Sequence, residues 1–197
     1  PALFAGILVG PVMWLCSAML VNQPNGYGEM AVFDAANQWR NAILFVPAIL
    51  AQITLPLLSS SINNDVQFVK ILKYNVVINT AISLVLATLI SLLSYHIMNV
   101  YGNGFAESGM VLIIMAMSTV LISINNVVGQ AIAGKGKMWI GFFLNLIWAI
   151  TLFSINSIFM KYNFGAIGLA LSLLISYAFH TIVQSFYVFI FIIKFNK

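Results

Sequence analysis

The stretch DAANQWRNAILFVPAILAQITLPLLSSS, residues 34–61, decides the fold. It is long enough to cross a bilayer, yet it contains an arginine, two prolines and a regular series of polar side chains. At about 100° per residue, one side of a helix collects the polar stripe Asp34, Asn37, Arg40, Asn41, Gln52 and Ser59. A helix surrounded by lipid would not carry this polar stripe. The stripe therefore predicts a second, wetter surface, which is either the interior of a tight bundle or a water-filled cavity.

Composition places the whole chain in a membrane. Of its 197 residues, 62% are hydrophobic and 6% are charged, and the mean hydropathy is +1.04. Soluble domains carry about 25% charged residues, so we expect an all-α integral membrane protein. The net charge of +4 comes from bases scattered in short loops, so we expect no nucleic acid partner. The chain begins with Pro1 rather than Met and is apolar at once, so we expect a fragment that starts at or inside a spanning helix.

The sequence offers no pattern for a metal or cofactor site. Its single cysteine, Cys16, lies in an apolar segment and is interpreted as a small buried hydrophobic residue. One cysteine excludes both a disulfide framework and a cysteine cluster. We therefore expect no metal and no cofactor.

Hydropathy predicts a single lobe of six membrane-spanning helices, each with the ~20 apolar residues that a bilayer requires. They are expected over residues 2–21, 34–61, 74–98, 108–133, 139–160 and 166–193. Residues 22–30 are interpreted as a loop rich in turn formers, and residues 61–73 as a polar connection with a short interfacial helix. Because a proline inside a helix removes a hydrogen bond, Pro11, Pro47 and Pro56 are candidate hinges.

The basic residues predict how the chain is oriented. The segments after the second and fourth helices and the C-terminus contain Lys70, Lys73, Lys135, Lys137, Lys194 and Lys197. Among the other loops, only Lys161 is basic. Loops rich in lysine and arginine stay in the cytoplasm. We therefore expect both termini to be cytoplasmic and the Arg40 end of its helix to lie toward the outside.

Two groups of motifs resemble one known family of transporters. The first is the turn YGNGF at residues 101–105, the N-x-x-G-Q pattern at residues 126–130 and the basic loop GKGK at residues 134–137. The second is an aromatic-x-A-A-x-Q pattern at residues 33–38, followed by the prolines and the L-S pair at 58–59. Together they resemble the C-terminal half of polysaccharide (O-antigen, Wzx-like) flippases of the MOP superfamily, which also contains the MATE exporters. Ala31 departs from the family, which often has glycine there.

The resemblance implies a fold and a function. Such proteins have two lobes of six helices around a central cavity, so the chain is expected to be helices seven to twelve, with the first lobe as its missing partner. The implied activity is the movement of undecaprenyl-pyrophosphate-linked oligosaccharide, such as an O-antigen repeat unit, across the bacterial inner membrane, with membrane lipid around it.

Other functions stay open at this point. A MATE-like small-molecule exporter and a flippase for another glycan share the same resemblance. A membrane-embedded glycan polymerase or acyltransferase would need clustered acids and histidines or a sizeable outer loop, and the four acids here are dispersed. We therefore expect that the protein is not an enzyme. The polar stripe argues only weakly against a scaffold that transports nothing.

The candidate substrate-binding residues are Arg40, Asn37, Asn41, Gln52 and Asn79. A guanidinium can bond two oxygens of a pyrophosphate or an acidic sugar at once, and amides can hydrogen-bond to sugars. The alternatives are an interfacial anchor for Arg40 and hydrogen bonds between helices for the amides.

Two further residues are candidates for ion coupling, Asp34 and His180. His180 belongs to a ridge at i, i+4 spacing with Ser172, Ser176 and Gln184, and the favoured alternative is that this ridge joins helices. Asp34 lies near a loop, so a surface position is its alternative. The helix over 108–133 also ends in polar residues, namely Asn125, Asn126 and Gln130, without an assigned role.

Overall fold

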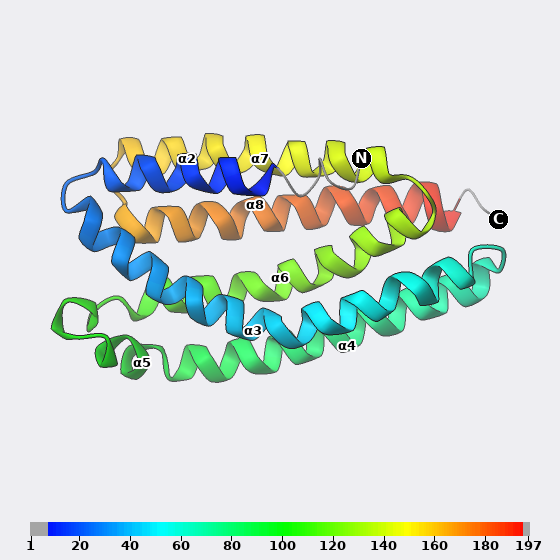
Figure 1. The fold of residues 1–197 in the computed structure, drawn as a ribbon, viewed down its shortest axis with the longest axis horizontal. Helices are drawn as coiled ribbons and strands as arrows, with labels where there is room; N and C mark the ends of the chain where they lie inside the picture. The colour runs from blue at the N-terminus through cyan, green and yellow to red at the C-terminus, as the bar shows by residue number, and fades with distance from the viewer. Residues whose placement is uncertain (1–7, 195–197) are drawn as a thin grey trace.

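The computed structural model describes residues 8–194 and consists of packed helices (Figure 1). The long helices are α2 (Val9–Val21), α3 (Gly26–Ser60), α4 (Asp65–Leu92), α6 (Gly109–Gly134), α7 (Met138–Lys161) and α8 (Gly165–Val188). The short ones are α5 (Ser94–Val100), the 3₁₀ turn η1 (Asn103–Phe105) and the π-helical end η2 (Phe189–Lys194). The expected all-α class is confirmed. Of the predicted first helix, residues 2–7 lie outside the described residues.

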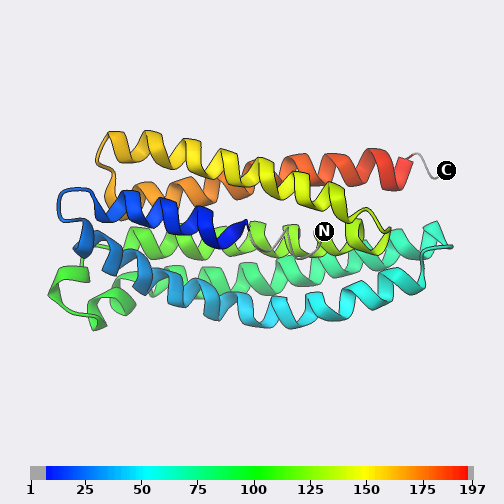
Figure 2. The same cartoon turned by 45° about the horizontal axis from the view of Figure 1, so that its top comes forward.

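Within the described residues, five helices are long and apolar enough to cross a membrane: α3, α4, α6, α7 and α8, the last counted to Phe191. They run side by side and are joined at alternate ends, and α2 lies along α7 (Figures 1 and 2). α6 is the central helix, because it contacts α3, α4, α5, α7 and α8. Its apolar span is 67% buried, whereas that of α4 is only 17% buried. α4 is therefore the least buried of these five spans.

The hydrophobic core has two main parts, separated along the helices. One part lies toward the α2–α3 turn and includes Phe33, Met115, Leu152 and Leu169. The other lies toward the opposite end and contains nine buried residues, Leu58, Phe68, Leu72, Val127, Val128, Ala131, Ile132, Leu144 and Val188. Tyr177, His180 and Gln184 lie on α8 between these two parts, within residues 174–187. The polar residues therefore lie at the middle level of the bundle.

Two helix starts differ from those predicted. α3 begins at Gly26, eight residues before the predicted start at Asp34. The turn from α2 ends at Asn25, which adopts the left-handed conformation (φ 56°), so the helix can begin at the next residue. α4 begins at Asp65, so the separate interfacial helix expected within 61–73 is wrong. The Asn64 side chain accepts a hydrogen bond from the Gln67 backbone N–H (3.0 Å) and caps this long helix. Phe68 is buried, and it lies on the face of α4 that packs against the other helices deeper in the bundle.

The prolines do not interrupt their helices. α3 is continuous through Pro47 and Pro56, of which Pro47 is buried and Pro56 is exposed. Pro11 lies in the first turn of the described part of α2, where a proline costs no intrahelical hydrogen bond. The hinge function of these three residues stays a prediction.

Two polar contacts tie distant turns together, one at each end of the bundle. Near the start of α3, the Glu29 Oε2 accepts a hydrogen bond from the Ala166 backbone N–H (2.7 Å), so its carboxylate caps α8. At the other end, the Lys135 Nζ lies 2.9 Å from Asp65 Oδ1 and 3.3 Å from the Ile62 carbonyl. The ammonium also lies 4.6 Å from the centre of the Phe68 ring. These contacts fix the α7–α8 turn to α3 and the α6–α7 turn to the α3–α4 turn.

We expect Lys135→Gln to lower the free energy of unfolding by about 1–2 kcal/mol, between the values for exposed and for buried ion pairs. Only 10% of the Lys135 side chain is exposed, so its loss leaves the Asp65 carboxylate without its partner. Thermal unfolding in a mild detergent measures the effect. Lys137→Gln is the matched control, because Lys137 is exposed and, among the described residues, its ammonium contacts only the Tyr187 ring, whose centre lies 5.8 Å away. Equal unfolding temperatures for the two variants would contradict the contact's stabilising role.

Candidate functional site

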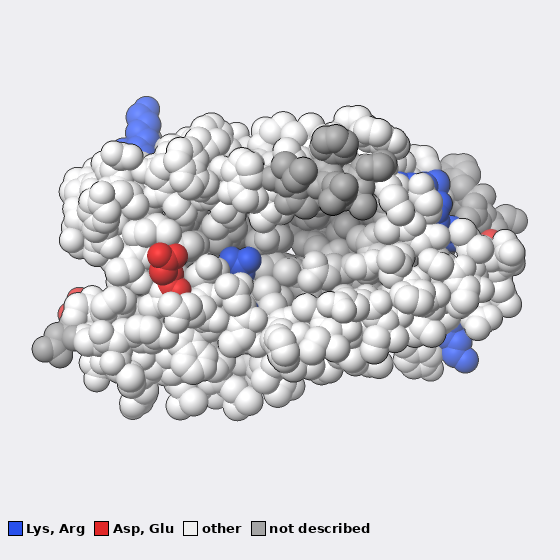
Figure 3. Space-filling model, in the orientation of Figure 1, with Lys and Arg blue, Asp and Glu red and all other residues white. Residues whose placement is uncertain are grey.

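A cavity of about 450 Å³ opens at the middle level of the bundle, between α3, α6, α7 and α8. Figure 3 shows a hollow between the side formed by α2, α7 and α8 and the side formed by α3 and α4, with a basic side chain at its edge. The polar and aromatic residues that line the cavity are Asn125, Asn126, Gln130, Asn145, Trp148, Tyr177, His180 and Gln184. Among the described lining residues there is no acid and no permanently charged base. The cavity wall therefore combines uncharged polar groups with a larger apolar surface.

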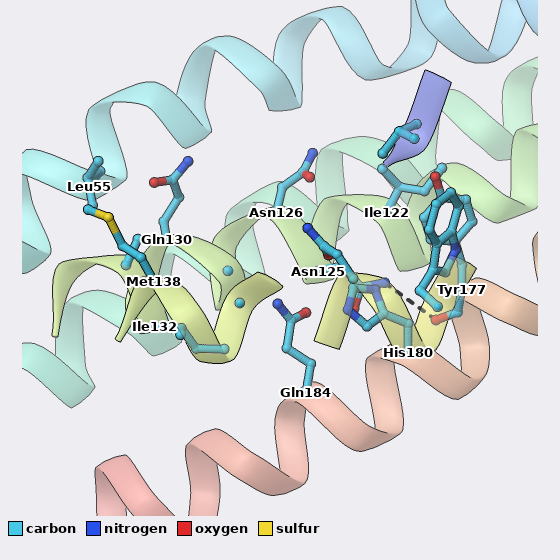
Figure 4. Close-up of a pocket in the computed structure, with 16 residues that line it drawn as sticks. Leu55, Ile122, Asn125, Asn126, Gln130, Ile132, Met138, Tyr177, His180 and Gln184 are labelled. Carbon is cyan, nitrogen blue, oxygen red and sulfur yellow. Dashed lines mark hydrogen bonds between the residues drawn. The ribbon is translucent and has the colours of Figure 1, made fainter. Parts of the chain in front are cut away.

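Amide groups from α6 and α8 form one network across this wall (Figure 4). In the orientation that satisfies its hydrogen bonds, the Gln184 amide nitrogen donates to Asn125 Oδ1 (3.2 Å), and its oxygen accepts from the Gly129 backbone N–H (3.3 Å). Asn125 Nδ2 in turn donates to the Tyr177 carbonyl (3.4 Å). A Cβ at Gly129 would approach the Gln184 amide to 3.3 Å, so a larger residue there would push this amide out of its place in the network. The network fixes α6 and α8 against each other behind the cavity.

Two ring side chains of the wall present polar atoms that nothing in the described part of the chain satisfies. His180 is 6% exposed and Trp148 is 2% exposed. Both imidazole nitrogens and the Trp148 indole N–H lack a hydrogen-bond partner among the described residues. Buried polar groups in native proteins almost always have a partner, which is often water or a ligand. The Trp148 and Tyr177 rings lie next to each other, with centroids 5.2 Å apart. This part of the cavity therefore combines aromatic surface with unused hydrogen-bonding capacity.

Arg40 lies beside this cavity, although it is not one of the lining residues. Its Nη1 donates to Asn37 Oδ1 (2.8 Å), as their i, i+3 spacing on the polar stripe allows. Its Nε is buried and has no partner in the described structure. The guanidinium is close enough to act electrostatically on the Tyr177 hydroxyl of α8. Arg40 is thus turned into the bundle and retains donors for an anion.

The other predicted substrate-binding residues are placed differently. Asn41 and Gln52 are exposed on α3, and their side chains form no hydrogen bond with another described residue. Asn79 does not line this cavity either, so its part in substrate binding stays a prediction. It is 1% exposed, and its amide donates to the Asn75 carbonyl (2.9 Å). The reason is packing: its i+4 neighbour Ser83 hydrogen-bonds to Ser123, so this face of α4 is covered by α6.

The two candidates for ion coupling are also separated. His180 lines the cavity, whereas Asp34 is exposed on α3. No carboxylate faces His180 among the residues that line the cavity. The coupling function of both residues stays a prediction.

Several lining residues had no assigned role in the sequence. Asn145 and Trp148 lie in the mainly apolar helix α7, and Tyr177 lies next to the polar ridge of α8. The available signal was their spacing: Gly141, Asn145 and Trp148 share one face of α7, as Tyr177, His180 and Gln184 share one face of α8. Each face is too short to stand out by itself. The site forms only where these two faces meet the face of α6 that carries Asn126 and Gln130.

Comparison with known proteins gives relatives of one kind. The chain is 27% identical over 176 residues to the EPS I polysaccharide export inner membrane protein EpsE of Ralstonia nicotianae (strain ATCC BAA-1114 / GMI1000). It is 26% identical to the protein of the same name from Ralstonia solanacearum. Each match covers 87% of this chain, and the chain spans about 40% of the length of these curated relatives. No family model matches the chain.

Solved structures share the fold. A MATE protein crystallised in complex with MaL6 superposes with a TM-score of 0.85 at 15% identity, covering 93% of this chain and 43% of that protein. An outward-facing multidrug resistance MATE family transporter gives 0.83 at 16% identity, covering 93% and 42%. A MOP superfamily transporter from Pyrococcus furiosus, described as having a binding pocket of reverse polarity, gives 0.82 at 12% identity, covering 96% and 43%.

These matches confirm the resemblance that the motifs predicted. The shared part is a single helical lobe in each case, since less than half of every matched protein is covered. The chain has the fold of one lobe of a MATE/MOP-type transporter, and its curated relatives are polysaccharide export inner membrane proteins.

Proposed function

We propose that this chain forms one half of a flippase that moves a lipid-linked oligosaccharide across a bacterial inner membrane. The observation that carries the proposal is a cavity, lined by uncharged amide and aromatic side chains on an apolar background, at the middle level of a membrane-spanning bundle. Transporters of this general kind bind their substrates near the bilayer midplane. The names of the curated relatives support polysaccharide as the substrate class. An O-antigen or related repeat unit on an undecaprenyl pyrophosphate carrier is the substrate we favour.

The chemistry of the cavity fits sugars. A sugar hydroxyl both donates and accepts hydrogen bonds, and so does a side-chain amide, so the amides of Asn126, Gln130 and Asn145 match it well. The adjacent rings of Trp148 and Tyr177 offer a flat apolar surface to the C–H face of a pyranose. Arg40, beside the cavity, would bond the pyrophosphate of the carrier. A cationic drug would need an acid, and the described lining offers none, which favours a glycan over a MATE-like drug substrate.

The distribution of lysines supports the proposed orientation. Lys70 and Lys73 lie near the start of α4, at the same end of the bundle as Lys135, which contacts Asp65. Lys161 lies at the opposite end, where α7 finishes. Positively charged ends remain in the cytoplasm. The end with Lys135 would therefore face the cytoplasm, and the start of α3 would face the periplasm.

The proposed mechanism needs no covalent step, so we propose a transporter rather than an enzyme. This lobe would rock against a second lobe and expose the cavity to each side in turn. The contacts of Glu29 with α8 and of Lys135 with the α3–α4 turn hold the lobe together as it moves. The second lobe, the expected missing partner, would complete the cavity.

Plugging the cavity tests the proposal. Gly141 lines the cavity, and no described atom lies within 4 Å of a Cβ added there, so the side chain of Gly141→Trp has room to start and would project an indole into the cavity. We expect polysaccharide export by the intact protein to fall at least tenfold in a strain that depends on it, while membrane insertion is unchanged. Gly104→Trp is the control, because Gly104 is exposed, has the same open space and lies outside the cavity. Unimpaired export by Gly141→Trp at normal protein levels would refute the proposed path.

A further inference from the structure

The outer surface of α4 has two adjoining apolar hollows near the lysine-rich end of the bundle. One, of about 410 Å³, lies between α4, α6 and α8 and is walled by residues such as Val76, Val128 and Val188. The other, of about 490 Å³, lies along α4 and includes Lys70 and Tyr74. Lys73 and Val77 line both hollows. They therefore form one continuous surface with basic groups in it.

The lysines of this surface are free to bind an anion. Lys70 and Lys73 are both exposed, and neither has a hydrogen bond, ion pair or ring contact within the described part of the chain. Lys135 and Lys137, at the same end, differ: each lies over an aromatic ring, and Lys135 also pairs with Asp65. The two free ammonium groups lie three residues apart, on adjacent turns of one helix face.

Their depth matches the headgroup region of a bilayer. At 1.5 Å per residue, Lys70 and Lys73 lie about 8 and 12 Å along α4 from its first residue, Asp65. The apolar walls at Val76 and Val77 follow deeper along the same helix. Tyr74, 60% exposed, has the amphipathic character that suits the membrane interface. Along α4 the surface therefore presents its two lysines first, then Tyr74, and then Val76 and Val77, an order that complements the anionic headgroup, the interfacial region and the acyl chains of a phospholipid.

We propose that this surface is a binding site for an acidic phospholipid of the cytoplasmic leaflet. The lipid phosphate would lie between Lys70 and Lys73, and an acyl chain would fill the groove between α4 and α8. α4 is the least buried of the five candidate spans, so lipid reaches it directly. The site is separate from the cavity, with which it shares no lining residue. Two juxtamembrane lysines correspond to roughly a thirty-fold preference for an anionic over a zwitterionic headgroup.

Native mass spectrometry of the intact, delipidated protein tests this site, with phosphatidylglycerol and phosphatidylethanolamine added at equal concentrations. We expect the unmodified protein to retain phosphatidylglycerol at least tenfold more tightly. The double variant Lys70→Gln/Lys73→Gln should lose this preference. Lys161→Gln, which removes an exposed lysine at the opposite end, should keep it.

A second variant tests the groove rather than the charge. Val77 lines both hollows and is 64% exposed, so Val77→Trp fills them without disturbing the core. It should weaken binding of phosphatidylglycerol several-fold although both lysines remain, and size-exclusion profiles should show that the protein stays folded. Equal retention of the two lipids by the unmodified protein, or an undiminished preference in the double variant, would overturn the proposal. So would displacement of phosphatidylglycerol by an equimolar polyprenyl phosphate, because the occupant would then be the carrier lipid.

Discussion

Gly26→Ala is expected to lower the free energy of unfolding by about 2–4 kcal/mol, at the upper end of the cost of overpacking. Gly26 is buried at the first position of α3. A Cβ there would lie 2.1 Å from the Val21 carbonyl oxygen and 2.6 Å from that of Leu20. These atoms belong to the backbone at the end of α2, so relief requires α2 and α3 to separate. A lower unfolding temperature in detergent, with the loss of monodisperse protein, is the measurement.

Gly28→Ala is the matched control, two residues further along the same helix. The three atoms nearest to a Cβ at Gly28 all belong to the Asn25 side chain, the first at 2.8 Å, and this exposed side chain can rotate away. Alanine is favoured over glycine inside a helix by roughly 0.5–1 kcal/mol. Gly28→Ala should therefore be neutral or stabilising. If the two variants unfold at the same temperature, the close approach of α2 to Gly26 does not carry the stability assigned to it.

The same glycines show why helix ends were harder to predict than helices. The apolar centres of the spans follow from composition, because the bilayer sets their length and leaves a helix as the way to satisfy the backbone. Gly26 and Gly28 look like turn residues in a sequence, since glycine favours turns. In the structure, Gly26 serves a close contact between two helices. That function depends on where α2 lies, which no local pattern contains.

The start of α4 was missed for a related reason. The segment after Ser61 is polar and basic, and it was interpreted as a connection at the membrane surface. Asn64 caps the helix, Asp65 pairs with Lys135 seventy residues away, and Phe68 packs beneath that lysine. The local cap was visible in the sequence, but the distant lysine was not. Polar residues here extend a spanning helix beyond the apolar region instead of ending it.

The candidate site was predictable in part. The pairing of Arg40 with Asn37 follows from their spacing on the polar stripe, and the structure shows it. Asn79 and Asn125 look alike in the sequence, since each is an amide in an apolar helix. Asn79 is covered by α6, whereas Asn125 opens onto the cavity. A polar residue thus indicates that a helix has a partner or a wet surface, and the packing of the neighbours decides which.

Arg40→Ala is expected to reduce polysaccharide export by the intact protein by roughly ten- to a hundredfold. Hydrogen bonds to charged groups contribute about 1.5–3 kcal/mol, and each 1.4 kcal/mol is a factor of ten. The Arg40 Nε is buried without a partner in the described structure, so the side chain has a donor available for a pyrophosphate oxygen. Export of labelled glycan, at matched protein levels in the membrane, is the measurement.

Arg40→Lys separates the two explanations for this arginine. An anchor at the membrane interface needs only a positive charge, so lysine would restore export fully. A pyrophosphate ligand uses the planar fork of the guanidinium, which lysine lacks, so export should recover only in part. The structure favours the second result, because Arg40 is half-buried, pairs with Asn37 and lies close to Tyr177 of α8. Lys161→Ala, which removes an exposed cation outside the cavity, should leave export unchanged; unimpaired export by Arg40→Ala would exclude Arg40 from substrate binding.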